Sequence, residues 1–81
     1  MPDEQISDRI ESLVKEEHTL LHRAESEHGL DDDGHARMQQ VQVELDQCWD
    51  LLRQRRARRS AGQDPDESSL RAPDTVEHYL Q

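Results

Sequence analysis

The chain has 81 residues, with 19 Asp or Glu against 10 Lys or Arg, and its formal net charge is −9. The hydrophobic fraction is 31%, and no apolar run approaches the roughly 20 residues that a membrane-spanning helix requires. These values exclude a multidomain enzyme with a large cavity and predict a protein outside the membrane. A single cysteine excludes an intrachain disulfide, and the start of the chain has no pattern typical of a secretory signal. We therefore expect a cytoplasmic protein.

The negative charge is unevenly placed. Residues 1–33 contain 11 acids against 3 bases, whereas residues 53–59 contain five arginines and no acid. Half of the basic residues thus lie in one block of seven. A composition this polar lies close to that of disordered chains, so the local pattern must decide whether the chain folds.

Residues 3–28 are predicted to form the first helix. Their apolar positions recur at steps of three and four, which is typical of a coiled-coil seam, with Glu17 as its one polar member. No Gly or Pro interrupts this segment, and Gly29 is a natural stop. The seam consists of Ile6, Ile10, Leu13, Glu17, Leu20 and Ala24.

Residues 34–60 are predicted to form a second helix with the same periodicity. Asp31 and Asp32 are N-cap candidates for it, and Gly34 weakens its first turn. Trp49 and Leu51 flank its seam, which ends where the arginine block begins. This seam consists of Met38, Val41, Leu45, Cys48 and Leu52.

The turn at residues 29–33 is short enough to make the two helices antiparallel neighbours. A turn centred on residue 31 would set Leu13 opposite Trp49 and Leu21 opposite Val41. It would also place the arginine block near three acids of the first helix. These are Asp3, Glu4 and Asp8. The fold predicted for residues 1–60 is an all-α, coiled-coil-like helical hairpin.

A two-helix hairpin buries only one apolar stripe, and small bundles usually need a staple or a partner. We therefore predict a homodimer that forms a four-helix bundle. The candidates for this second contact lie beside the main seams. They are Val14, Leu20, Val43 and Leu51.

The remaining residues divide into two parts. Residues 61–72 contain Gly62, Pro65 and two serines, and this composition predicts a flexible linker. Residues 73–81 are predicted to form one short helical segment, capped by Asp74, with an apolar side made of Val76, Tyr79 and Leu80. A helix this short is not stable alone, so docking and disorder both remain open for it.

The arginine block has two interpretations. Its five guanidinium groups could bind nucleic-acid phosphates, because arginine binds phosphate bidentately. The acidic balance of the chain and its scarce aromatic residues argue against nucleic acid as a partner. The alternative, which we favour, is that the block neutralises the acidic turn opposite it. The block consists of Arg53, Arg55, Arg56, Arg58 and Arg59.

Two histidines raise the question of a metal site. His18 and His22 are four residues apart on one helix face, a spacing that can bind zinc, and the predicted register places Glu44 across from His18. Such spacings arise by chance in a helix rich in Glu and His, so we expect neither a bound metal nor a cofactor. Cys48 lies on a seam with no catalytic partners in reach, which predicts that the protein is not an enzyme.

Four strings resemble a known family. Leu45–Arg59 (LDQCWDLLRQRRARR), Leu13–Leu20 (LVKEEHTL), Gly29–Asp33 (GLDDD) and Asp74–Gln81 (DTVEHYLQ) are similar to motifs of the small actinobacterial domain-of-unknown-function family 2630. The resemblance covers nearly the whole chain and implies a soluble, cytoplasmic bacterial protein. It implies no activity, cofactor or catalytic residue.

Together, these patterns predict a non-enzymatic helical module that binds an unknown protein partner. The predicted contact residues are Trp49, Leu51, Val76, Tyr79 and Leu80. A nucleic-acid-associated protein that uses the arginine block and a metal-binding bundle that uses His18 and His22 are the alternatives.

Overall fold

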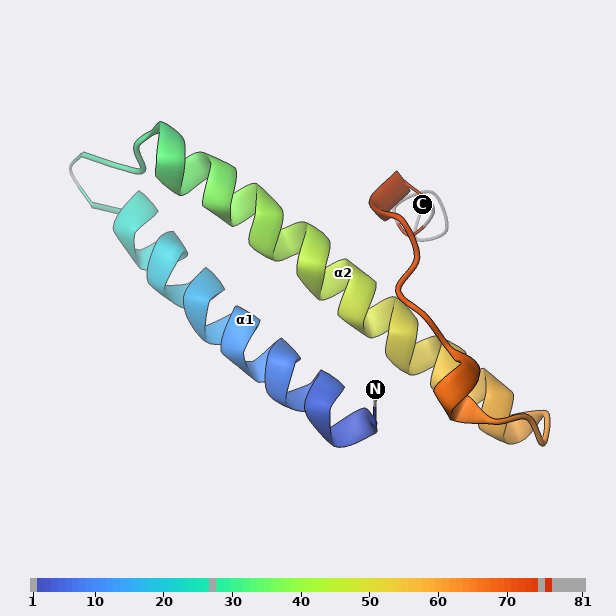
Figure 1. Cartoon of the computed structure of the whole chain (residues 1–81). Coiled ribbons are helices and arrows are strands. Elements are labelled where there is room, and N and C mark those ends of the chain that lie inside the picture. The colour runs from blue at the N-terminus through green and yellow to red at the C-terminus, as the bar shows by residue number, and fades with distance from the viewer. Residues whose placement is uncertain (1, 27, 75, 77–81) are drawn as a thin grey trace.

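A computed structural model describes residues 2–26, 28–74 and 76. Two long helices, α1 (Asp3–Ala24) and α2 (Asp32–Ser60), lie side by side and antiparallel, as Figure 1 shows. A short 3-10 helix, η1 (Pro65–Glu67), follows α2. The described part of the chain contains no strand. The all-α helical hairpin predicted from the sequence is therefore confirmed.

Helix α1 ends at Ala24, four residues before its predicted end at residue 28. The Ser26 hydroxyl and the Ser26 backbone N–H both donate to the carbonyl of Arg23, at 2.6 and 3.1 Å. Serine offers the backbone this local alternative to helical hydrogen bonding, and here the alternative ends the helix. Gly29 then adopts a φ of 63°, which glycine reaches without a steric penalty, within the connection to α2.

Helix α2 begins at Asp32, two residues earlier than predicted, and Asp31 is its N-cap as expected. The Asp31 carboxylate accepts a 2.7 Å hydrogen bond from the backbone N–H of Gly34. A Cβ at Gly34 would lie 3.0 Å from Leu30 Cδ2 and 3.1 Å from the capping oxygen of Asp31. Glycine is therefore suited to a position where helix propensity alone disfavours it.

The core lies between the two helices, but its register differs from the predicted one. Leu21 and Trp49, both predicted to face the opposite helix, are 47% and 51% exposed. Leu51, predicted to flank its seam, is instead buried, and Leu20, which the apolar spacing placed on the first seam, is buried as well. Because α1 ends early, the chain reverses before residue 31, and the facing residues shift. The core consists of Ile6, Ile10, Leu13, Leu20, Val41, Leu45, Cys48 and Leu51.

Ion pairs on one side of the hairpin fix the observed register. Arg37 donates to the Glu16 carboxylate with both Nε and Nη2, and Arg9 donates to Glu44. The hydrogen bond from Arg37 is the main cause that lowers the pKa of Glu16 below its usual value. These pairs link the helices at two levels, on the side of the hairpin where the rest of the chain returns.

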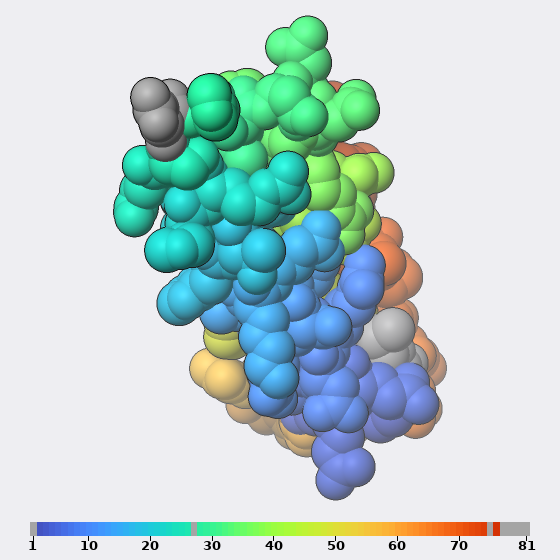
Figure 2. Space-filling view, turned by 90° about the vertical axis from the view of Figure 1, so that its left-hand side faces the viewer, coloured from blue at the N-terminus to red at the C-terminus, as the bar shows by residue number. Residues whose placement is uncertain are grey.

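Residues 61–74, which include the segment 61–72 predicted to be a flexible linker, pack against α2 and are called the strap below. In Figure 1 this orange segment turns at the end of α2 and runs back along that helix. Gln54 donates to the carbonyl of Ser69 at 2.7 Å, and Gln47 donates to that of Arg71 at 3.1 Å. In Figure 2, α1 covers most of the face turned to the viewer, and the strap shows at its edge.

Candidate functional site

Three segments of the chain meet at Arg55, near the end of α2. Its side chain is only 8% exposed and donates to the carboxylates of Asp3, in the first turn of α1, and Asp66, in η1. The Asp66 contact is 2.9 Å long. The hydrogen bond to Asp3 is the main cause that raises the pKa of Arg55. A buried guanidinium needs such partners, because an unpaired buried charge is costly.

Two further arginines of the block also pair with acids. Arg59 donates to Asp3 at 2.9 and 2.6 Å, and Arg58 donates to Glu67 in η1 at 3.3 Å. The Arg55 hydrogen bond, with the charge of Arg59, holds the pKa of Asp3 below its usual value. Two of the five arginines, Arg55 and Arg59, thus pair with Asp3 in the acidic first turn, in the direction that the favoured interpretation predicted. The two acids of η1 are additional partners that the sequence did not indicate.

Asp50 is the polar residue at the centre of the strap contact. It is 1% exposed, and Arg71 of the strap binds it bidentately, with Nε at 2.9 Å and Nη2 at 2.7 Å. Gln54 donates to the same carboxylate at 2.9 Å. The sequence pattern did not indicate this site. Two features of the sequence could have indicated this pair: the acidic residue Asp50 within the apolar string from Cys48 to Leu52, and Arg71 as the single basic residue in the acidic segment 60–81.

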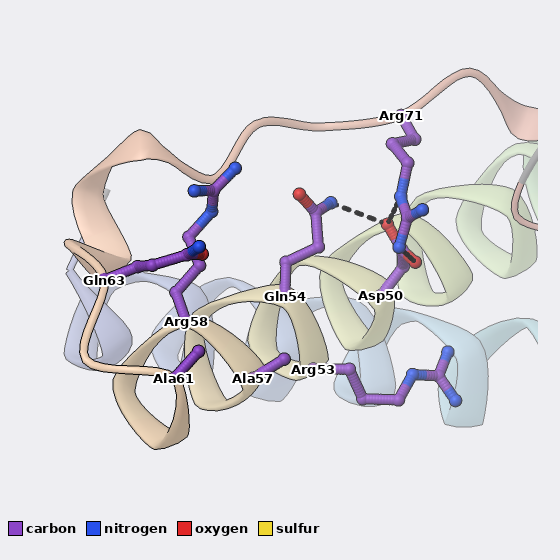
Figure 3. Close-up of a pocket in the computed structure, with 8 residues that line it drawn as sticks. All are labelled: Asp50, Arg53, Gln54, Ala57, Arg58, Ala61, Gln63 and Arg71. Atoms are coloured by element: carbon purple, nitrogen blue, oxygen red, sulfur yellow. Dashed lines mark hydrogen bonds and ion pairs between the residues drawn. The ribbon is translucent and has the colours of Figure 1, made fainter.

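A pocket of about 410 Å³ lies between the strap and α2. Figure 3 shows Gln54 and Arg58 rising from α2 toward the strap, and Arg71 descending from the strap onto Asp50. In this view the Arg53 side chain runs the other way, away from Arg58 and from the strap. The pocket is lined by Asp50, Arg53, Gln54, Ala57, Arg58, Ala61, Gln63 and Arg71.

A second groove, of about 570 Å³, lies between the first half of α1 and the middle of α2. Buried Cys48 and Leu51 contribute to its lining from α2, and Leu70 of the strap, which is 57% exposed, lines it as well. Burial raises the pKa of the Cys48 thiol. A protonated, buried thiol is a poor nucleophile, so Cys48 serves here as a core residue.

The opposite side of the hairpin exposes apolar side chains. Leu21 follows Glu16 by five residues and Trp49 follows Glu44 by five, so each lies about 140° around its helix from an ion-paired carboxylate. Trp49 also lies about 160° from Gln47, which binds the strap. Leu21 and Trp49 therefore define a face of the hairpin that the strap does not cover, called the strap-free face below. Leu51 does not belong to this face.

The histidines considered as metal ligands are exposed on α1. His18 and His22 border a shallow hollow with Leu21 and Glu25. Glu44, expected across from His18, pairs with Arg9 instead, and Arg9 lies nine residues, or about 13 Å, along the helix from His18. The observed register thus separates Glu44 from the two histidines. Residues 2–26, 28–74 and 76 contain no group of three His, Cys, Asp or Glu arranged to hold a metal.

Of the final apolar residues, Val76 is 1% exposed, and its N–H donates to the carbonyl of Ala72. Val76 is therefore not an open contact surface. Tyr79 and Leu80, the other predicted contact residues of this segment, lie outside the described residues. No helix in the described part of the chain has the length and apolar character needed to cross a membrane.

Comparisons with known proteins identify relatives of unknown function. Uncharacterised proteins of Mycobacterium bovis and Mycobacterium tuberculosis are 47% identical over 72 residues, which cover 86% of this chain and 80% of each relative. No solved structure matches the chain. The model of the DUF2630 family, described as proteins of unknown function, matches residues 2–81. The chain therefore belongs to the DUF2630 family.

Proposed function

We propose that this protein is a non-enzymatic helical module for protein–protein interaction, and that it first binds a second copy of itself. The observation that carries the proposal is the exposure of Trp49, whose side chain is half open on the strap-free face. Tryptophan is among the residues that most often anchor protein interfaces. We place the module in the cytoplasm, where reducing conditions suit the free thiol of Cys48.

Partly buried apolar residues extend the strap-free face beyond its two exposed members. Val14 lies seven residues before Leu21, within about 20° of the same side of α1, and Leu52 lies three residues after Trp49 on α2. Covering the exposed half of Trp49 would contribute about 2 kcal/mol per copy. This apolar stripe is suited to a helical surface rather than to a polar ligand.

A second copy is the partner that the geometry favours. The hairpin buries one stripe between α1 and α2, and two helices alone give a thin core. Packing two strap-free faces together would form a four-helix bundle, in which each Trp49 gains a second apolar neighbour. A symmetric dimer uses the same patch on both copies, so one self-complementary stripe is enough.

Sedimentation velocity on the full chain tests this proposal. We expect the wild type to sediment as a dimer at micromolar concentration, and the double variant Leu21→Glu, Trp49→Glu to sediment as a monomer with its helices intact. Leu70→Glu is the control for each single charge, because it places one glutamate on another exposed leucine, outside this face. A wild type that remains a helical monomer throughout the concentration range would show that self-association is wrong.

Trp49 provides a second readout because it is the sole tryptophan. If the dimer covers Trp49, its fluorescence emission shifts to longer wavelength as the protein is diluted and the dimer dissociates. We expect the same dilution to leave the emission of the single variant Leu21→Glu unchanged, because a charge at residue 21 should already prevent dimerisation. An emission maximum independent of concentration in the wild type, together with dimeric sedimentation, would place the interface elsewhere.

A further inference from the structure

The groove between the first half of α1 and the middle of α2 combines a buried apolar base with polar sides. Cys48 and Leu51 form the base from α2, and the exposed side chain of Leu70 stands at the edge next to the strap. A volume of about 570 Å³ falls within the usual range of binding sites, which are mostly apolar with a few polar groups. The remaining lining residues are polar, namely Gln5, Asp8, Arg9, Ser12, Glu44 and Gln47.

The strap runs past this groove. Gln54 binds the Ser69 carbonyl, and Gln47, seven residues earlier in α2, binds the carbonyl of residue 71. The strap thus follows α2 back toward its start, a course that Figure 1 also shows. Leu70, which lies between these two contacts, and Gln47 both line the groove. The chain therefore passes the groove at residues 70 and 71.

Residues 77–81 lie outside the described part of the chain, and they follow a residue from which the groove can be reached. The Val76 N–H donates to the Ala72 carbonyl, a contact that spans one helical turn and keeps Val76 roughly 8 Å from Arg71. An extended chain adds at most about 3.6 Å per residue, so position 80 lies no more than roughly 14 Å beyond Val76. Val76 is almost completely buried, so the segment starts from a fixed point on the folded chain.

The composition of this segment suits the groove. Leu80 is apolar, and Tyr79 has an apolar ring with a hydroxyl that can bond to a polar side of the groove. Cys48 and the exposed side of Leu70 provide apolar neighbours for both side chains. Because Val76 already attaches the segment, docking orders only the residues after it. That entropic cost is smaller than the cost of capturing a separate chain.

We propose that residues 77–81 bind in the groove of their own chain, with the Tyr79 and Leu80 side chains against its apolar base. The segment that the sequence predicted as a partner contact thus contacts the hairpin to which it belongs. A separate apolar partner binds there only after it displaces this segment. The described lining of the groove contains no residue of the strap-free face, so this proposal and the dimer can fail separately.

Disulfide formation in the full chain tests the proposal, because Cys48 is the sole cysteine and lines the groove. With oxidised glutathione as the oxidant, Leu80→Cys should form an intrachain disulfide with Cys48, since this bond requires Cα atoms within about 7 Å of each other. Mass spectrometry without reductant measures the bond at high dilution. Leu21→Cys places the same thiol on the strap-free face and should form no intrachain bond.

The variant Gln81→Cys distinguishes a docked segment from a free one. A free segment brings neighbouring positions to Cys48 equally often, whereas docking aligns one of them, so we expect the yield from Leu80→Cys to be about fivefold higher. Equal yields from these two variants would overturn the proposal. A bond formed only between two copies would also overturn it, because the groove would then hold the segment of a second chain.

The reactivity of Cys48 provides a second measurement that needs no cross-link. The double variant Tyr79→Ser, Leu80→Ser should make Cys48 react about tenfold faster with a soluble disulfide reagent, because thiol reactivity follows access. The control double variant His78→Ser, Gln81→Ser changes two polar residues of the same segment and should alter the rate less than about twofold. Equal rates in the two double variants would contradict the docking. If circular dichroism shows that the first pair loses helix content, Leu80→Ser alone replaces it.

Discussion

Arg71 binds Asp50, which lies 21 positions before it in the chain, and this contact turns the strap back onto α2. The carboxylate is almost completely buried, whereas the guanidinium remains 40% exposed. The pair thus joins a charge that has lost its water to one that keeps part of it. Removing the Arg71 side chain should leave the buried Asp50 carboxylate without its main partner.

Arg71→Ala tests that dependence. We expect the free energy of unfolding to fall by about 2–3 kcal/mol, because a buried carboxylate loses two charge-assisted hydrogen bonds. Urea titration followed by circular dichroism measures the change, and the exposed Arg56→Ala is the control. The double variant Asp50→Ala, Arg71→Ala should recover part of the loss, since no charge then remains buried. No difference between Arg71→Ala and Arg56→Ala would mean that the strap contributes nothing to stability.

Leu51→Ala and Leu70→Ala test the observed core. Leu51 is 4% exposed between the helices, so its truncation should cost about 2–4 kcal/mol of stability. Leu70 is mostly exposed on the strap, and its truncation should cost about 0.5 kcal/mol or less. Urea unfolding midpoints of the two variants provide the comparison. Similar midpoints would contradict the register, which places Leu51 inside.

Acid should release the first turn of α1 from the end of α2. The pKa of Asp3 is lowered from 3.8 by Arg55 and Arg59, so its ionised form stabilises the fold fully above about pH 3.8, and this contribution is lost as pH falls through the lower folded value. Asp3→Asn should therefore flatten the decline of thermal stability below about pH 4. The control is Glu4→Gln in the same turn. If that decline is as steep in Asp3→Asn as in the wild type, the pairing does not contribute to stability.

Gly34→Ala should destabilise the protein although alanine is the better helix former. A Cβ there would crowd the Leu30 side chain and the Asp31 oxygen that caps α2, and we expect a net loss of about 1 kcal/mol. Thermal unfolding measures it. Ala36→Gly, two residues along the same helix at an exposed position, measures the loss of stability that glycine causes in a helix when no side chain crowds it. A more stable Gly34→Ala would mean that the crowding relaxes freely.

The spacing of apolar residues predicted the two helices and most of the core. It did not predict the register between the helices, which depends on how the connection between them closes. Apolar spacing identified both helices and most of the core, including Ile10, Leu13 and Leu45. It misplaced Leu21 and Trp49 because register depends on where α1 ends, and the Ser26 hydrogen bonds that end it are local details without a periodic signal.

The same limit applies to the candidate site. The charge pattern identified the contact between the arginine block and Asp3, since both lie at helix ends that the hairpin brings together. It did not identify the strap, because the Asp50–Arg71 pair joins a helix to a segment whose composition is typical of a linker. Only the folded chain shows that residues 61–74 return along α2.

Arg55 contacts one residue 52 positions before it and another 11 positions after it. One guanidinium thus closes a long loop and a short one, and the interactions that offset the entropic cost of closing each are made at the same buried point. Fraying of the first turn of α1 removes one partner of Arg55 and weakens its hold on η1. The first turn of α1 and η1 should therefore open together, with shared rates of amide hydrogen exchange.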